Sequence, residues 1–292
     1  MAIILGINRY INLYRATLSQ FFHWSIWWPL LVFGGLNILL LYTFTHYPDP
    51  VAHAVLQPYL TVMNNLVSAL GIADNTVTAF SHYPQLYYLL PTQFEWGRFA
   101  LGAVLEGLAL ALCARAFARL YNGGASKWPT IGFRLWIVLV GIWLCVYILL
   151  SAVTYAIPTI FHEWLMGSPR RMQLFDFGLF CLNLIVYATV AYAIPIVSLR
   201  RVRAWEAAKM SVRLFLRFPV MSFAILFIPS LIFSYPLNWS ISGAAGIIGR
   251  LQPEVSAYLL GALVVADVVV SYFYVGAVIR LILDETPVGS QS

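Results

Sequence analysis

The chain has 292 residues, of which 61% are hydrophobic and only 10% are charged. A soluble domain carries about 25% charged residues, so this composition excludes an ordinary soluble protein and predicts an all-α, polytopic membrane protein. The net charge of +6 does not indicate nucleic-acid binding, because the basic residues lie at the ends of apolar segments rather than in one polar patch.

Six apolar segments are long enough to cross a bilayer, and amphipathic segments flank them. Residues 1–21 carry two arginines among apolar side chains, which is typical of a helix lying on the membrane surface. Two further peripheral amphipathic helices are expected at residues 51–70 and 200–216. The expected spans, within a single integral membrane domain over residues 1–292, are about 24–42, 97–121, 135–157, 175–197, 219–235 and 255–281.

The second span is predicted to organise the helix bundle. Thr92 and Glu95 have the spacing of a capping box, so the helix is expected to begin at Thr92, directly after Pro91. Residues 122–124, Asn-Gly-Gly, are a typical stop signal. Six small residues recur at helical spacing and form a seam that allows close helix packing: Ala100, Ala103, Gly107, Ala111, Ala114 and Ala118.

The distribution of basic residues predicts the orientation in the membrane. Six spans place both termini on the same side, and 13 of the 17 Lys and Arg residues fall on that side. The four on the other side are Arg98, Arg170, Arg171 and Arg250. The positive-inside rule therefore predicts a multi-pass membrane protein with both termini in the cytoplasm.

The segment between spans four and five is the most basic part of the chain. Trp205, Ala208, Val212 and Phe215 fall on one face of a helix there, which predicts an interfacial helix held by anionic lipid headgroups. The residues expected to contact headgroups are Arg200, Arg201, Arg203, Lys209 and Arg213.

Polar residues in three spans form a candidate intramembrane polar site. Glu106, Asn183 and Asp267 are expected near a common depth, and Ser271 and Tyr274 share a helix face with Asp267. No Lys or Arg is expected at that depth, so one or both acids are expected to be protonated and hydrogen-bonded to Asn183, Ser271 or a tyrosine. These five residues are either a proton or cation site or an interhelical clip that fixes helix register.

Two prolines lie inside predicted spans. Pro195 and Pro229 mark either broken helices around a transport site or kinks whose freed backbone groups are satisfied by neighbouring helices. The three cysteines all lie in apolar runs and are expected to be buried apolar residues: Cys113, Cys145 and Cys181. No enzyme motif or metal-ligand spacing is present, so no catalytic residue, metal or cofactor is expected.

One short segment resembles a known family. Residues 205–211 (WEAAKMS), followed by residues 214–219 (LFLRFP), resemble a bacterial family of six-span inner-membrane proteins related to the membrane domain of glycerophosphodiester phosphodiesterases. That family has a Glu-Ala pair, a Ser four or five residues later and then a span, and residues 274–283 are similar to its last helix. The resemblance implies a six-span fold and an inner-membrane location. The chain carries no phosphodiesterase domain, so that activity is not expected.

Three functional hypotheses follow. The first is a non-enzymatic inner-membrane protein that acts as a scaffold or accessory subunit; its partners are the lipid bilayer and a membrane protein or a second copy of the chain. The alternative is a small transporter or channel in which Glu106 and Asp267 bind a proton or cation. The third is intramembrane lipid chemistry, for which no nucleophile–base pair is visible.

Overall fold

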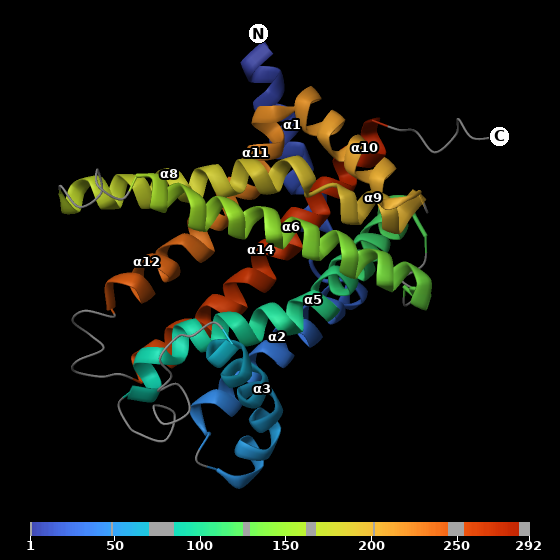
Figure 1. Ribbon diagram of the computed structural model, residues 1–292. Coiled ribbons are helices and arrows are strands. Elements are labelled where there is room, and N and C mark those ends of the chain that lie inside the picture. Colours follow the sequence, from blue (N-terminus) through green and yellow to red (C-terminus); the bar gives the residue numbers. More distant parts are fainter. Residues whose placement is uncertain are drawn as a thin grey trace. The chain divides into compact units, whose positions relative to one another are not determined.

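In a computed structural model of the protein, the described part of the chain is helical and contains no strand (Figure 1), which confirms the predicted all-α class. The structure describes residues 2–47, 49–69, 85–124, 129–161, 168–200, 202–244 and 254–285. The helices are α1 (Ala2–Ser19), α2 (Trp24–Thr45), α3 (Pro50–Ala69), α5 (Gln85–Tyr121), α6 (Phe133–Ile160), α8 (Pro169–Val190), α9 (Ala193–Arg200), α10 (Ala204–Arg217), α11 (Pro219–Pro229), the π-helix η1 (Ser230–Ser234), α12 (Tyr235–Ala244) and α14 (Val255–Glu285).

Six segments in the described part of the chain are long and apolar enough to cross a membrane, which confirms the predicted number of spans. They are Trp24–Thr45, Leu90–Tyr121, Phe133–Ile160, Arg170–Arg200, Pro219–Ile241 and Val255–Glu285. Each extends a few residues beyond its predicted limits, because the helices continue past the apolar stretch that a hydropathy argument detects. The peripheral helices α1, α3 and α10 are not among them.

The helices form two compact units. Unit 1 contains Met1–Leu30, Ala103–Ser230 and Val270–Ser292, and unit 2 contains Leu31–Gly102 and Leu231–Val269. Three long helices, α2, α5 and α14, contribute residues to both units.

The core of unit 2 packs the amphipathic helix α3 against α2, α14 and the beginning of α5. Leu56 and Leu60 of α3 are buried in one cluster with Phe44 of α2 and Phe94 of α5. Tyr59 lies beside them, and its hydroxyl donates a hydrogen bond to the side chain of Gln93 over 3.3 Å. Burial raises the pKa of Tyr59 to about 12, so the hydroxyl remains a donor at neutral pH.

The predicted start of the second span is wrong. Helix α5 begins at Gln85, so Thr92 lies inside the helix and does not cap it. Leu90 and Phe94 are 0% and 2% exposed in the core of unit 2. Their close packing against α2, α3 and α14 outweighs an N-cap at Thr92, which contributes about 1 kcal/mol, so packing favours the longer helix.

The predicted end of α5 is confirmed. Gly123 has a φ of 71°, a left-handed conformation that glycine adopts without strain. The N–H of Gly124 donates to the carbonyl of Arg119 over 2.9 Å, and the N–H of Gly123 donates to the carbonyl of Leu120 over 3.0 Å. This is the hydrogen-bond pattern of a Schellman motif, in which the last helical carbonyls are satisfied by the turn itself.

The core of unit 1 forms where α1 crosses α14. A Cβ atom added at Gly276 would lie 2.4 Å from Cγ2 of Thr17 and 2.8 Å from Cζ of Phe117, so only glycine fits at this crossing. Tyr272 donates from its hydroxyl to the carbonyl of Thr17 over 2.8 Å and stacks on Trp27 with the ring centroids 4.3 Å apart. These contacts hold the first peripheral helix against the last span.

The small-residue seam of α5 is used for packing over its second half. Gly107, Ala111, Ala114 and Ala118 are buried, whereas Ala100 is exposed. A Cβ atom at Gly107 would lie 3.2 Å from the backbone oxygen of Leu139 in α6. The close approach of the α5 and α6 backbones in unit 1 therefore depends on the absence of a side chain at this position.

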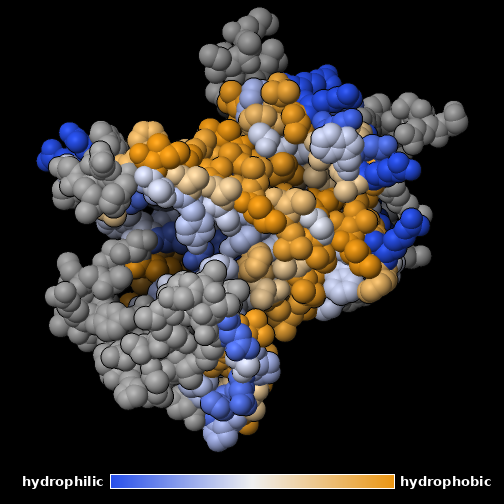
Figure 2. All heavy atoms as spheres, in the orientation of Figure 1, coloured by the Kyte–Doolittle hydropathy of each residue, from blue (hydrophilic) through white to orange (hydrophobic). Residues whose placement is uncertain are grey.

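Helices α6 and α8 lie side by side in unit 1 (Figure 1). Only 11% of the most apolar window of α6 is buried, the lowest share among the six spans. In Figure 2, apolar side chains cover much of the face that these two helices present, and the most hydrophilic side chains lie at their ends. Cys113 is buried as expected, whereas Cys145 of α6 is exposed, because α6 turns most of its surface away from the protein interior.

An ion-pair network joins the first and last helices of unit 1. Glu285 at the end of α14 accepts from Arg9 of α1 and from Arg217 of α10, each over 2.6 Å. The guanidinium group of Arg9 also lies 4.7 Å from the ring centroid of Phe218. The middle of α1, the end of α10 and the end of α14 therefore meet at one place.

Candidate functional site

A charged cluster lies inside the membrane spans of unit 2. The Nη2 atom of Arg98 in α5 lies 2.7 Å from Oδ2 of Asp267 in α14. The hydroxyl of Ser234 in the π-helix donates to Oδ1 of the same carboxylate, also over 2.7 Å. Three spans thus contribute one side chain each, and both carboxylate oxygens are occupied.

The irregular backbone after Pro229 positions the side chain of Ser234 in this cluster. Proline has no N–H, so it interrupts the α-helical hydrogen-bond ladder, and the next five residues form the π-helix Ser230–Ser234. A π-turn contains more residues than an α-turn, so it rotates the following side chains relative to a regular helix. Ser234 is only 7% exposed, which is consistent with its side chain being held on Asp267.

The expectation that no cation lies near the intramembrane acids is wrong for Asp267. The predicted span begins at residue 97 and puts Arg98 at its outer end, but the observed span begins at Leu90. Arg98 therefore lies about two turns inside the span, where its long side chain reaches Asp267. An upstream apolar signal was present in the sequence, because Leu89, Leu90 and Phe94 precede the arginine.

A second polar residue in unit 2 was not among the candidates. Asn37 of α2 is 1% exposed, and its Nδ2 donates to the carbonyl of Phe33 over 2.9 Å. Its Oδ1 is buried and has no hydrogen-bond partner among the described residues. An isolated Asn in an apolar run was the only signal for it in the sequence.

The other predicted site residues belong to unit 1. Glu106 is half-buried, and its carboxyl group lies within electrostatic range of Tyr187 and Tyr274, whose ring centroids are 5.8 Å apart. Asn183 donates from Nδ2 to Oγ1 of Thr154 over 3.1 Å and so links α8 to α6. Ser271 is half-buried. A meeting of Glu106 with Asp267 stays a prediction.

Tyr274 satisfies a carbonyl that a proline has freed. Span four is interrupted at Ala191 and Tyr192, between α8 and α9. The carbonyl of Ala191 has no regular donor, because the residue four positions later is Pro195. The buried hydroxyl of Tyr274 donates to this carbonyl. A neighbouring helix thus satisfies this carbonyl, as one of the two interpretations of Pro195 expects.

Ser211 of α10 satisfies two more backbone groups at the same break. Its hydroxyl donates to the carbonyl of Thr189 over 2.7 Å and accepts from the N–H of Tyr192 over 3.2 Å. Ser211 and Ala207 are both 0% exposed and form the buried side of α10. The serine and the alanine of the sequence motif at residues 205–211 therefore have a structural role in this chain.

The carbonyl freed by Pro229 also accepts a hydrogen bond from a tyrosine of another helix. Pro229 leaves the carbonyl of Ile225 without its regular helical donor, and the hydroxyl of Tyr14 in α1 donates to that carbonyl over 2.8 Å. A tyrosine from another helix therefore repairs the backbone at each of these two prolines.

The basic helix α10 presents an apolar side to its surroundings. Trp205 and Val212 are 69% and 40% exposed, as an interfacial helix requires. Nζ of Lys209 lies 5.1 Å from the Trp205 ring centroid. Arg203 and Arg213 are exposed, and Arg200 ends α9. Arg201 lies outside the residues that the structure describes.

No family model matches this chain, and no curated protein or solved structure matches it either. Among the described residues no group of three or more His, Cys, Asp and Glu side chains is arranged to hold a metal ion.

Proposed function

We propose that this chain is a non-enzymatic protein of the bacterial inner membrane that acts as a scaffold or accessory subunit for another membrane component. The observation that carries the proposal is the exposed beginning of α8. Residues 170–178 of this span are all exposed except Phe175, and they include the carboxylic acid Asp176. Acidic side chains within spans normally face a protein interior or a partner, so this segment fits the surface of another membrane protein.

The polar contacts inside the spans support the same role. Asp267 is engaged by Arg98 and Ser234, and Asn183 is engaged by Thr154. Such contacts fix the register of neighbouring helices in lipid, where apolar surfaces alone give no preferred register. A rigid helix arrangement is what a scaffold requires.

The proposed orientation places both termini in the cytoplasm. Support comes from the network at Glu285, in which α1 and the end of α14 meet as an even number of spans requires. Arg217, the last basic residue of α10, belongs to the same network through its ion pair with Glu285. The positive-inside rule assigns a region as rich in basic residues as α10 to the cytoplasmic side.

The test is recovery of a partner in mild detergent. We expect the affinity-purified wild-type chain to bring down one membrane protein, or a second copy of itself, in a fixed stoichiometric ratio. An Asp176→Leu variant should lose most of this recovery, because the exposed carboxylate no longer has its complementary contact. An Asp284→Leu variant, which changes an exposed acid near the C-terminal end of α14, should keep it. A chain that is always monomeric and alone would contradict the proposal.

A second candidate function is proton or cation transport through unit 2. The π-helix next to the Arg98–Asp267 pair favours it, since π-turns inside helices frequently occur at functional sites. Oδ1 of Asn37, which has no hydrogen-bond partner within the described part of the chain, supplies a further polar atom in the same unit. In this function the ion pair opens and Asp267 exchanges Arg98 for the transported ion.

Vesicles containing the purified chain and carrying a pH or cation gradient test the transport function. We expect Asp267→Asn to reduce flux at least tenfold if the carboxylate binds the ion. Glu106→Gln tests the other predicted acid in the same assay, and Asp284→Asn is the matched control outside the cluster. Flux equal to that of empty vesicles for the wild-type chain, or unchanged flux in Asp267→Asn and Glu106→Gln, removes these acids from any transport mechanism.

A further inference from the structure

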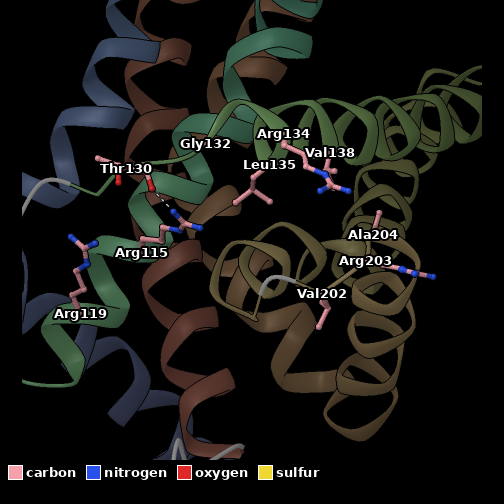
Figure 3. A pocket seen from close by; sticks show the side chains of 10 residues that line it. All are labelled: Arg115, Arg119, Thr130, Gly132, Arg134, Leu135, Val138, Val202, Arg203 and Ala204. Carbon is pink, nitrogen blue, oxygen red and sulfur yellow. Dashed lines mark hydrogen bonds between the residues drawn. The ribbon is translucent and has the colours of Figure 1, made fainter. Parts of the chain in front are cut away.

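A basic pocket of about 800 Å³ lies at the ends of several helices in unit 1 (Figure 3). This is the size of a small-molecule site rather than of a packing defect. Of the ten described residues that line it, four are arginines and none is acidic. The lining residues are Arg115, Arg119, Thr130, Gly132, Arg134, Leu135, Val138, Val202, Arg203 and Ala204.

One arginine is fixed to the backbone and the other three are exposed. The Nε atom of Arg115 donates to the carbonyl of Ser198 over 2.9 Å, and its Nη1 donates to the carbonyl of Thr130. In Figure 3 the guanidinium groups of Arg115 and Arg134 lie near Leu135, whereas those of Arg119 and Arg203 extend away to opposite sides. The side chains of Arg134 and Arg203 are exposed, so they can turn toward an anion that enters the pocket.

The beginning of α6 adds positive potential to the same pocket. The first N–H groups of a helix have no intrahelical acceptor, and they carry the positive end of the helix dipole. Gly132 is the N-cap residue of α6 and makes no side-chain cap, and Gly132, Arg134 and Leu135 all line the pocket. Phosphate is an anion that such a helix end and arginine side chains bind well.

Apart from Thr130, the remaining lining of the pocket is apolar, and it continues toward the interfacial helix. Leu135, Val138 and Val202 form the apolar part of the wall. Trp205 of α10 follows directly after the lining residue Ala204 and is 69% exposed, as a side chain at the headgroup level is. Basic pockets between spans on the cytoplasmic side are typical sites for phospholipid headgroups.

From this combination we infer that the pocket between α5, α6 and the α9–α10 junction binds a phosphate group, carried by an anionic phospholipid headgroup or by free phosphate. The site does not depend on the proposed scaffold role, and its test needs no protein partner.

The experiment uses the full chain in zwitterionic nanodiscs, with phosphatidylglycerol or inorganic phosphate as the probe. The pocket variant is Arg134→Gln with Arg203→Gln, which leaves the structural Arg115 in place. The control variant is Arg170→Gln with Arg171→Gln, which removes the same charge from exposed arginines outside the pocket. Thermal unfolding in zwitterionic lipid verifies that both variants are folded.

We expect the dissociation constant for phosphatidylglycerol to rise about tenfold or more in the pocket variant and to change less than about twofold in the control. If inorganic phosphate does not displace the lipid, the headgroup is the source of the phosphate. If inorganic phosphate binds with the same dependence on Arg134 and Arg203, free phosphate is the ligand. Equal binding losses in the two variants, or no loss in either, would overturn the site.

Discussion

Replacing Arg98 with leucine is expected to lower the free energy of unfolding by about 3 kcal/mol, because the carboxylate of Asp267 then loses its cation inside a membrane span. The side chains of both residues are 28% exposed, so solvent screens the pair only in part. Ser234 still donates to Oδ1 of Asp267 in the variant, but one neutral donor does not replace a guanidinium group. Reversible unfolding in a detergent or bicelle system measures the change.

Two further variants separate the ion pair from a general effect of mutating a span. The double variant Arg98→Leu with Asp267→Leu should lose less stability than Arg98→Leu alone, because it leaves no unpaired charge. Arg280→Leu removes an ion pair on the same helix, where Arg280 and Asp284 are 3.2 Å apart and 40% and 35% exposed. This control should change stability by less than about 0.5 kcal/mol. If Arg98→Leu and Arg280→Leu lower the free energy of unfolding equally, the intramembrane pair contributes no more to stability than an exposed ion pair.

The spans and one helix end were predictable because their signals are local. A run of apolar residues long enough to cross a bilayer needs no knowledge of its neighbours, and all six runs form helices. The end of α5 was equally predictable, since Gly123 and Gly124 provide both the left-handed residue and the N–H groups of the turn. In these cases the residues that carry the signal also make the contacts.

The start of α5 and the partner of Asp267 were not predictable in the same way. A capping signal at Thr92 competes with burial of Leu90 and Phe94, and that burial comes from residues of α2, α3 and α14 far away in the chain. The ion pair depends on this longer helix, which moves Arg98 into the span. Ser234 reaches Asp267 through a π-turn, and a register shift of that kind has no signature in a hydropathy pattern.

The polar residues of the spans illustrate a related limit. Tyr274 was predicted as part of a polar site with Asp267, because the two share a helix face in the sequence. Its hydroxyl is instead occupied by the carbonyl of Ala191, which lies far away in sequence next to the break before Pro195. The proline itself was a visible signal for an unsatisfied carbonyl, but the sequence does not identify the donor that approaches it.

Replacing Tyr274 with phenylalanine is therefore expected to destabilise the protein by about 1–2 kcal/mol, because only the hydroxyl is removed and the carbonyl of Ala191 is left without a donor. The effect should depend on Pro195. In a Pro195→Ala background the new N–H lies four residues after Ala191 and can donate to that carbonyl, as Ile196 already does to Tyr192 over 2.9 Å. In that background, the loss of stability caused by Tyr274→Phe should be less than half of its value in the wild-type chain.

The same comparison of a tyrosine variant with and without the proline can be made at Pro229, and it tests the explanation independently. Tyr14→Phe should cost a similar amount in the wild-type chain and less in a Pro229→Ala background, because Tyr14 donates to the carbonyl of Ile225. Tyr155→Phe is the control, since Tyr155 is 63% exposed on α6. If either tyrosine variant costs as much with alanine at the proline position as with proline, its hydroxyl does not serve the freed carbonyl. Tyr274 would then again be available to a polar site with Glu106, because nothing in the backbone would require its hydroxyl.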